Sequence, residues 1–531
     1  MRGLRPALFV VALPIAAFLT VALRVRGHAQ TVAPFDIVMG VGLPGIDRGQ
    51  VVDDTRVPGS PDAARRHGIQ SGAEVRERVG AGGARVVTDR LIVRFRDGLS
   101  AAERQAALAL ASPGAVSERP SDADFDVVRL DARDDSEIAA LRLSQRADVE
   151  YAQPVHRLRT QFVPNDPLYK SNQWNLPLID LERAWDIQPQ AGSAIVVAVI
   201  DTGVAYTNAT LTVDLRSFSS GGVRYPALGR ATIPYAAAPQ LGPASRFVAP
   251  RDFVCGSTAP LDFDGHGTHV TGTIGQSTND GVGTAGVAFN VKIMPVKVLA
   301  STWDVAFGCA DSEGGFDDDV ARGIRYAVDN GARILNLSLG ADGPAGSAPV
   351  VEAAIKYAVG KGAFVALAAG NSFEDGNPMQ VLAEIASRVD GAVSVAAVDP
   401  QKSHAFYSSS GAFVELAAPG GSARGFGASG AIWQQTFDPN FSDTFLLPLA
   451  RFGAPRFDVF AYVPYQGTSQ ATPHVSGVAA LLMQQGIVDP VAIEKALETT
   501  ATDLGDPGRD PLFGFGLIEA RRALRGLGIV K

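Results

Sequence analysis

The chain has 531 residues, of which 46% are apolar and 19% are charged, so it can bury a large core but is too long for one compact domain without insertions. The net charge of -8 is uneven: residues 1–160 hold 22 basic and 20 acidic side chains (+2), and residues 161–531 hold 25 and 35 (-10). This acidic larger part argues against nucleic acid as a partner, because nucleic-acid binding needs a basic face.

The first 29 residues have the pattern of a secretory signal. Two arginines precede 17 uncharged residues from Ala7 to Leu23, and small residues that suit cleavage after Ala29 follow. We therefore expect a secreted, extracellular protein. An uncleaved signal anchor is the alternative, because the apolar run is long enough to span a bilayer and Arg24 flanks it. Only in that case would the membrane be a partner.

Residues 30–86 are rich in Gly, Pro, Arg and Asp without a sustained period, which indicates a flexible spacer. A small α+β domain is then expected over residues 87–160. Ser100 followed by Glu103 is a capping box that marks the start of its first helix. Its expected elements are a strand at 89–95, a helix at 100–112, a strand at 124–130, a helix at 134–145 and a strand at 149–155.

From residue 161 to residue 531, short apolar strands alternate with helical stretches such as residues 317–331. Strands that are apolar throughout and separated by helices predict a parallel sheet covered on both faces. The expected strands lie at 194–200, 291–299, 333–339, 363–370 and 392–398.

The chain contains two cysteines, Cys255 and Cys309. An even pair in an oxidising compartment favours a disulfide over free thiols. Two unrelated buried thiols are the alternative.

Four polar residues stand at or near the ends of predicted strands or helices. Asp201 ends a strand, His266 lies in "DGHGTHVTGTIG", Asn371 follows a strand, and Ser469 heads a helix of small residues. Taken singly, each is most simply a turn or cap residue. Together, an acid, an imidazole and a hydroxyl are the parts of an acyl-transfer triad. A zinc site at His266 and His269 is weakly supported, since the chain has no HExxH motif.

The order of these residues distinguishes between known triads. An α/β-hydrolase runs serine, acid, histidine around GxSxG, whereas this chain runs Asp201, His266, Ser469. The segments "VIDTGV", "DGHGTHVTGT", "NLSLG", "AAGN" and "GTSQATPHVSGVAALL" resemble, in order, the motifs of the subtilisin-like (subtilase, S8) serine endopeptidases. The resemblance covers residues 164–527. It implies a subtilisin-like α/β fold, a mostly parallel sheet flanked by helices, preceded by a ferredoxin-like inhibitory propeptide.

The resemblance also implies roles for particular residues. Asn371 would donate to the oxyanion. The backbone of a protein or peptide substrate would pair with Ser338, Leu339 and Gly340. The pocket for the residue before the cut would be lined by Ala368, Ala369 and Gly370. The chain departs from compact family members in the 65-position separation of Asp201 and His266 and the 98-position separation of Asn371 and Ser469, both of which are longer. It also has Gln470 where methionine is common. The structure and role of the long segments 208–262 and 421–465 are left open.

Catalysis by such a triad needs no cofactor. A structural calcium ion is implied by the resemblance of "PNDPLY" at Asp166 and "STNDGVG" at Asn279 to calcium-binding segments, and polar turns explain both segments equally well. The propeptide would act as an intramolecular inhibitor after a self-cut between residues 157 and 165. Activity should rise with pH through a histidine pKa near 6 to 7.

Two rival functions remain. "GVGTAG" at 281–286 matches the dinucleotide pattern, which would make the chain an oxidoreductase, but a polar stretch precedes it where a strand is required. The other rival is a catalytically silent subtilase that serves as a binding protein. The intact acid, histidine, serine and asparagine positions argue against it.

Overall fold

The structure is a computed structural model that describes residues 77–79, 85–131, 133–156, 162–220, 223–442 and 452–526. The signal segment, most of the spacer and residues 157–161 of the predicted processing window lie outside these ranges. Contacts divide the chain into two units that part between residues 160 and 161. None of the helices in the described ranges has the length and apolar character needed to cross a bilayer.

The smaller unit is an α+β domain with one antiparallel sheet, in the order β1-β2-β4-β3 with β5 paired to β2. The capping box of Ser100 and Glu103 is present, and the core is built on Leu91, Leu108 and Leu143. Five strand residues precede the expected start of the domain at residue 87, namely the three of β1 and the first two of β2, Arg85 and Val86. Its elements are β1 (Glu77–Val79), β2 (Arg85–Phe95), α2 (Ala101–Ala111), β3 (Val116–Glu118), β4 (Asp126–Arg129), α3 (Ser136–Ser144) and β5 (Val149–His156).

The larger unit is built on a seven-stranded sheet in the order β11-β12-β6-β13-β14-β15-β16, with every neighbouring pair parallel. The predicted parallel sheet is therefore confirmed. Its strands are β6 (Val196–Asp201), β11 (Arg251–Asp252), β12 (Lys292–Lys297), β13 (Ile334–Leu337), β14 (Phe364–Ala368), β15 (Ala392–Val398) and β16 (Leu416–Pro419).

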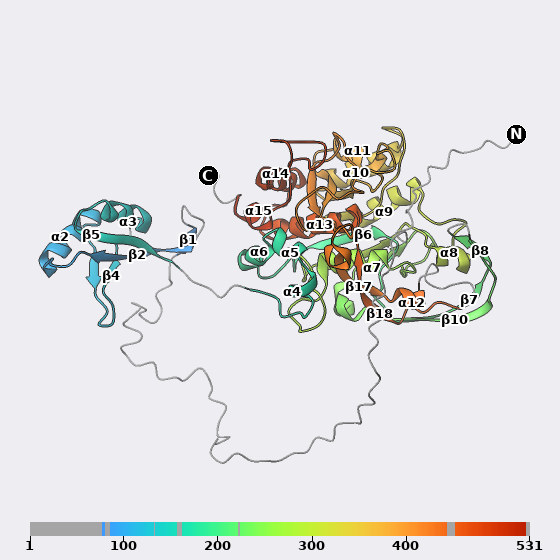
Figure 1. Ribbon diagram of the computed structural model, residues 1–531, viewed down its shortest axis with the longest axis horizontal. Coiled ribbons are helices and arrows are strands. Elements are labelled where there is room, and N and C mark those ends of the chain that lie inside the picture. The colour runs from blue at the N-terminus through green and yellow to red at the C-terminus, as the bar shows by residue number, and fades with distance from the viewer. Residues whose placement is uncertain are drawn as a thin grey trace, which may run out of the picture. The chain divides into compact units, whose positions relative to one another are not determined.

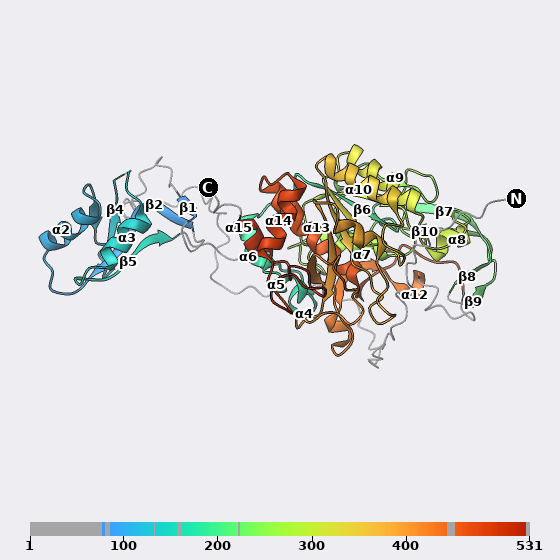
Figure 2. The same ribbon diagram turned by 90° about the horizontal axis from the view of Figure 1, so that it is seen from above.

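Helices cover both faces of this sheet (Figures 1 and 2). Along β6, Val197 and Val199 belong to the core that contains α7 and α13, whereas Ala198 and Ile200 belong to the core under α9 and α10. This alternation follows from the twofold side-chain period of a strand. The helices are α4 (Tyr169–Asn172), α5 (Asn175–Leu178), α6 (Leu181–Ile187), α7 (His266–Gly275), α8 (Thr302–Phe307), α9 (Asp317–Asp329), α10 (Pro349–Gly360), α11 (Val381–Ala386), α12 (Pro439–Ser442), α13 (Thr468–Gln484), α14 (Pro490–Thr500) and α15 (Ala520–Gly526).

The two long segments form β-hairpins that meet each other. The first contains β7 (Ala209–Leu215) paired with β10 (Gly229–Tyr235), and β8 (Phe218–Ser220) paired with β9 (Val223–Tyr225). The second contains β17 (Ile432–Phe437) paired with β18 (Phe460–Tyr465). A β-bridge joins Tyr235 to Phe457, and their rings pack with Phe263 and Phe437. The insertions therefore form one supporting layer, and β17 contacts α7.

Candidate active site

The predicted site residues gather at one edge of the parallel sheet. Asp201 is the last residue of β6, Ser338 follows β13 directly, and Asn371 lies three residues after β14. Parallel strands bring their carboxyl ends to the same edge, which is where sites form in such sheets. The helices that begin with His266 and Thr468 pack against each other, so Ser469 is brought to this edge as well.

Asp201 and His266 form a buried pair. His266 Nδ1 lies 2.7 Å from Asp201 Oδ1, which also accepts the Thr202 amide at 2.7 Å. Asp201 is fully buried and His266 nearly so. Burial alone lowers the pKa of His266, but the charge and the hydrogen bond of Asp201 outweigh it and raise the pKa to about 9. The Asp201 pairing therefore shifts the pKa of His266 upward from its ordinary value.

Two glycines allow α7 to start against Asp201. Gly265 has a φ of +104°, a left-handed conformation that favours glycine, and its carbonyl accepts the Thr436 hydroxyl of β17 at 2.6 Å. A Cβ on Gly267 would lie 2.1 Å from the Gly203 carbonyl oxygen, so only glycine fits there. The glycines of "DGHG" thus bring the imidazole close to the end of β6.

Ser469 is hydrogen-bonded to the residue that follows β13, because its own helix lacks one backbone hydrogen bond. Pro473 has no N–H, so it cannot bond to the Ser469 carbonyl four residues earlier. The Ser338 hydroxyl donates to that carbonyl instead, at 2.8 Å, and the Ser469 hydroxyl donates to the Ser338 carbonyl at 3.1 Å. No hydrogen bond joins Ser469 to His266 among the described residues. Such bonds are often long in free enzymes and shorten when substrate binds.

Asn371 has its side-chain amide in a fixed orientation. Its Oδ1 accepts both the backbone amide of Thr468 at 2.9 Å and the Thr468 hydroxyl at 3.0 Å. Because two donors hold the oxygen, the Nδ2 group is left to donate elsewhere. The Ser469 amide lies in the first turn of α13, where amides have no partner within the helix. Two donors near the Ser469 hydroxyl are therefore available to one acceptor oxygen.

The predicted substrate residues continue two adjacent strands beside Ser469. Ser338, Leu339 and Gly340 follow β13, while Ala368, Ala369 and Gly370 end and follow β14. Gln380, which no sequence motif identified, lies beside these segments. A Cβ on Gly370 would lie 2.4 Å from its Oε1, and one on Gly340 3.5 Å from it.

Asp342 fixes the orientation of Gln380. The Gln380 Nε2 donates to Asp342 Oδ1 at 2.5 Å and to the Pro378 carbonyl at 3.2 Å, which leaves Oε1 between the two glycines. No local motif announces this contact, because an isolated bridge between Asp342 and Gln380 creates it.

The other two histidines near the site have structural partners. His269 Nε2 lies 3.1 and 3.0 Å from the Ile432 and Val463 carbonyls, and its ring stacks on Tyr465. His474 lies 2.7 Å from the Asn175 amide nitrogen. Burial lowers the pKa of His269 to about 3 and that of His474 to about 4, so both are neutral. The partners of His269 are therefore the Ile432 and Val463 carbonyls and the Tyr465 ring, and not His266.

The structure also brings Asp166 and Asn279 together. Asp166 Oδ2 accepts the Asn279 amide at 2.7 Å, and Asn279 Oδ1 accepts the Asn165 amide at 3.2 Å. Asp166 is buried, which raises its pKa, and no ion pair to it is found in the described part of the chain. An unneutralised carboxylate beside amide oxygens fits the donor chemistry of Ca²⁺.

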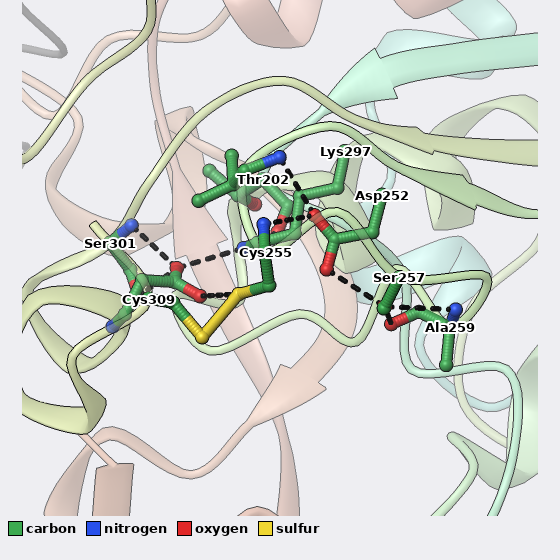
Figure 3. Close-up of a disulfide and its surroundings, with 10 residues drawn as sticks. Thr202, Asp252, Cys255, Ser257, Ala259, Lys297, Ser301 and Cys309 are labelled. Atoms are coloured by element: carbon green, nitrogen blue, oxygen red, sulfur yellow. Dashed lines mark hydrogen bonds and ion pairs between the residues drawn. A yellow bond between two sulfur atoms is a disulfide. The ribbon is translucent and has the colours of Figure 1, made fainter.

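Cys255 and Cys309 are joined in a disulfide (Figure 3). Their Cα atoms lie 5.0 Å apart, within the usual range for such bonds. The carboxylate of Asp304 lies close to both sulfurs, but sulfurs bonded to each other cannot act as thiolate ligands for a metal.

Comparison with known proteins agrees with this geometry. Residues 192–516 match the model of the subtilase family, and residues 73–154 match the fervidolysin N-terminal prodomain. The chain is 30% identical over 468 residues to a thermophilic serine proteinase of Bacillus sp. (strain AK1), covering 87% of this chain and 94% of that one. It is 30% identical to thermitase of Thermoactinomyces vulgaris over 68% of this chain and 100% of thermitase.

A solved protease of Pseudoalteromonas arctica PAMC 21717 is 27% identical, with a TM-score of 0.50, over 69% of this chain and 99% of that chain. The fold, the order of the site residues and these matches agree with one another. The chain is a serine protease that belongs to the subtilase family and carries a fervidolysin-like N-terminal prodomain.

Proposed function

We propose that this protease is a secreted endopeptidase that cuts proteins through the triad Asp201, His266 and Ser469. The observation that carries the proposal is the buried 2.7 Å contact between His266 Nδ1 and Asp201 Oδ1. It leaves Nε2 of His266 as the ring nitrogen that can take a proton from a nucleophile. Ser469, at the start of a helix that packs against α7, is the nucleophile.

The reaction proceeds in two halves. Ser469 Oγ attacks the substrate carbonyl carbon while its proton passes to His266 Nε2, and the oxyanion accepts hydrogen bonds from Asn371 Nδ2 and the Ser469 amide. The C–N bond then breaks, and the leaving amine takes the proton from His266. Water attacks the resulting ester in the same way, and Ser469 is released with a carboxylic acid product. Asp201 stabilises the imidazolium in both halves.

A fluorophosphonate probe tests the nucleophile directly. Peptide mapping of the labelled mature enzyme should place the probe on Ser469, and Ser469→Ala should abolish labelling and proteolysis. A correctly processed protein that is neither labelled nor active would support the rival binding function. Labelling at another serine would overturn the triad assignment.

We also propose that the protease is made as a zymogen and cuts itself between residues 157 and 165. The match to a prodomain supports this, as does the change from a +2 to a -10 segment near residue 160. The severed domain would remain as an inhibitor in the substrate site. Expressed without other proteases, Ser469→Ala should accumulate as a full-length chain, and the parent should show a mature N-terminus in that window. Equal processing of both chains would show that another protease makes the cut.

The contact of Gln380 with Gly340 and Gly370 supports a preference for short side chains before the scissile bond. The Gln380 carboxamide occupies space between the two segments that would receive this side chain, and two hydrogen bonds hold it there. Mass spectrometry of a digested denatured proteome should show mainly alanine, serine and other small residues before the cut. Gln380→Ala should admit leucine and phenylalanine, and an unchanged profile would contradict this role.

Calcium is proposed as a structural ion that Asp166 and Asn279 would help to hold. When bound, it would neutralise the buried Asp166 carboxylate and so secure the loop after α7. Chelation should then lower the thermal midpoint of the parent and leave that of Asp166→Asn unchanged. Equal midpoints of the parent with and without chelator would rule the ion out.

A further inference from the structure

A buried lysine lies beside the catalytic aspartate in the sheet. Lys297 is the last residue of β12, and in the parallel register it pairs with Asp201. Its side chain is fully buried, and its ammonium group donates to the Thr202 carbonyl at 2.6 Å and to Asp304 Oδ2 at 2.8 Å. Burying an ammonium group is costly unless it is paired, so Asp304 keeps the cation in place.

Asp304 is in turn held by α8 and the disulfide. Its Oδ2 also accepts the amide and the hydroxyl of Ser301, each at 2.8 Å, in a capping box at the start of α8. Its Oδ1 lies 3.8 Å from Cys255 Sγ, and Cys309 follows the end of α8 (Figure 3). The loop before Cys255 is bonded back to β12, because the Phe253 amide donates to the Lys297 carbonyl at 2.9 Å.

Thr202 connects this ion pair to the catalytic residues. Its amide donates to Asp201 Oδ1, and its carbonyl is the acceptor for Lys297. Its hydroxyl donates to Asp262 at 3.0 Å and accepts the Gly267 amide, next to His266, at 2.9 Å. A shift of the Thr202 peptide would therefore move the Asp201 carboxylate and the start of α7 relative to each other.

We infer that Lys297 and Asp304 are positioning residues of this protease: through Thr202 they hold Asp201 in the orientation that orients and stabilises the His266 imidazolium. This inference rests on the proposed triad. Neither residue touches substrate. The capping box with Ser301 holds the Asp304 carboxylate at the start of α8, so α8 acts as a support for the catalytic acid.

A double variant, Lys297→Met with Asp304→Asn, tests the inference by neutralising both members of the ion pair. Removing one member of a buried ion pair is strongly destabilising, because it leaves the other charge unpaired, so both members are changed together. Asp304→Asn keeps a side-chain oxygen that can accept from Ser301, whereas Lys297→Met removes the donor to the Thr202 carbonyl. Lys292→Met is the matched control, because Lys292 is an exposed residue at the other end of the same strand.

The double variant should lose roughly 10- to 100-fold in kcat, with KM changed less than about twofold, because only the catalytic geometry is disturbed. The pH midpoint of kcat/KM should move down toward the ordinary histidine value, because Asp201 would stabilise the imidazolium less well. Lys292→Met should match the parent in both measurements. A folded double variant with the kcat and pH midpoint of the parent would overturn the inference.

Ser301→Ala provides a milder test if the double variant does not fold. It removes one donor to Asp304 and should lower kcat severalfold without changing KM. A lower thermal midpoint with the kcat of the parent would show that the cluster serves folding alone, and would overturn the inference. The fluorophosphonate probe separates this outcome from failure of the triad: an unlabelled parent refutes the triad, whereas a labelled parent with equally fast variants refutes only the positioning role.

Discussion

The two halves of the active site are held by different kinds of interaction. On the Asp201 and His266 side, the supporting groups include the buried charges of Asp262, Lys297 and Asp304. On the Ser469 side, the supports are neutral: Asn336 Nδ2 donates to Ser338, and the Ser476 hydroxyl donates to Asn336. The half that must stabilise the imidazolium is thus built from charges, and the half that holds the Ser469 hydroxyl and the oxyanion donors is built from neutral hydrogen bonds.

The largest effect is expected from removing the negative charge of Asp201. Asp201→Asn keeps the shape of the side chain but removes the charge that stabilises the imidazolium and selects its tautomer. We expect a loss of roughly 10⁴-fold in kcat near neutral pH. Steady-state kinetics with enzyme concentration set by active-site labelling would measure it. A loss below tenfold in kcat would contradict the role of Asp201 in stabilising the His266 imidazolium.

On the neutral half, Asn371→Ala removes one oxyanion donor and should cost about 100- to 1000-fold in kcat with little change in KM. Since Asn371 carries no charge, the pH midpoint of the variant should equal that of the parent. Asn371→Asp serves as the comparison, because it keeps the acceptor for Thr468 but adds a negative charge beside the oxyanion. A pH midpoint displaced by Asn371→Ala would show that the two halves are electrostatically coupled.

The pH dependence of kcat/KM should reflect the titration of His266, which lies in the charged half. Only neutral His266 can accept a proton, and its pKa of about 9 leaves roughly 1% of it neutral at pH 7. We expect kcat/KM to rise nearly tenfold per pH unit up to about 9 and then level off. Because the pKa is raised on folding, the stability from this pair is complete below pH 6.5 and is lost as pH rises through 9. A midpoint at or below 6.5 would contradict the pairing.

The smallest effect is expected for Ser338→Ala. It leaves the half-buried Ser469 carbonyl without the donor that substitutes for the missing N–H of Pro473, which costs about 0.5–1.5 kcal/mol in the free energy of unfolding. Chemical denaturation would measure this loss, and kcat should fall only severalfold. Ser429→Ala is a suitable control, because that exposed hydroxyl bonds only within a turn. Equal stability of Ser338→Ala and the parent would show that water replaces the hydroxyl.

Much of the sheet could be predicted from sequence, because its strands are short apolar runs and its site residues stand at their ends. Asp201 and Asn371 were identified for that reason. The same pattern did not find Lys297, since a charged residue near a strand end ordinarily faces solvent. Its burial depends on Asp304 in α8, whose position is set by contacts with the long segment 208–262 and by the disulfide. Gln380 was missed for a similar reason, because only tertiary pairing brings it to Gly370.

The proline in α13 also has a consequence for how the protein folds. A helix normally holds its first turns by its own backbone bonds, but here the Ser469 carbonyl depends on a hydroxyl from the residue that follows β13. An isolated α13 segment therefore cannot fix the geometry of its own nucleophile. In refolding, helical content should recover before proteolytic activity, because the nucleophile reaches its working position only when β13 has docked.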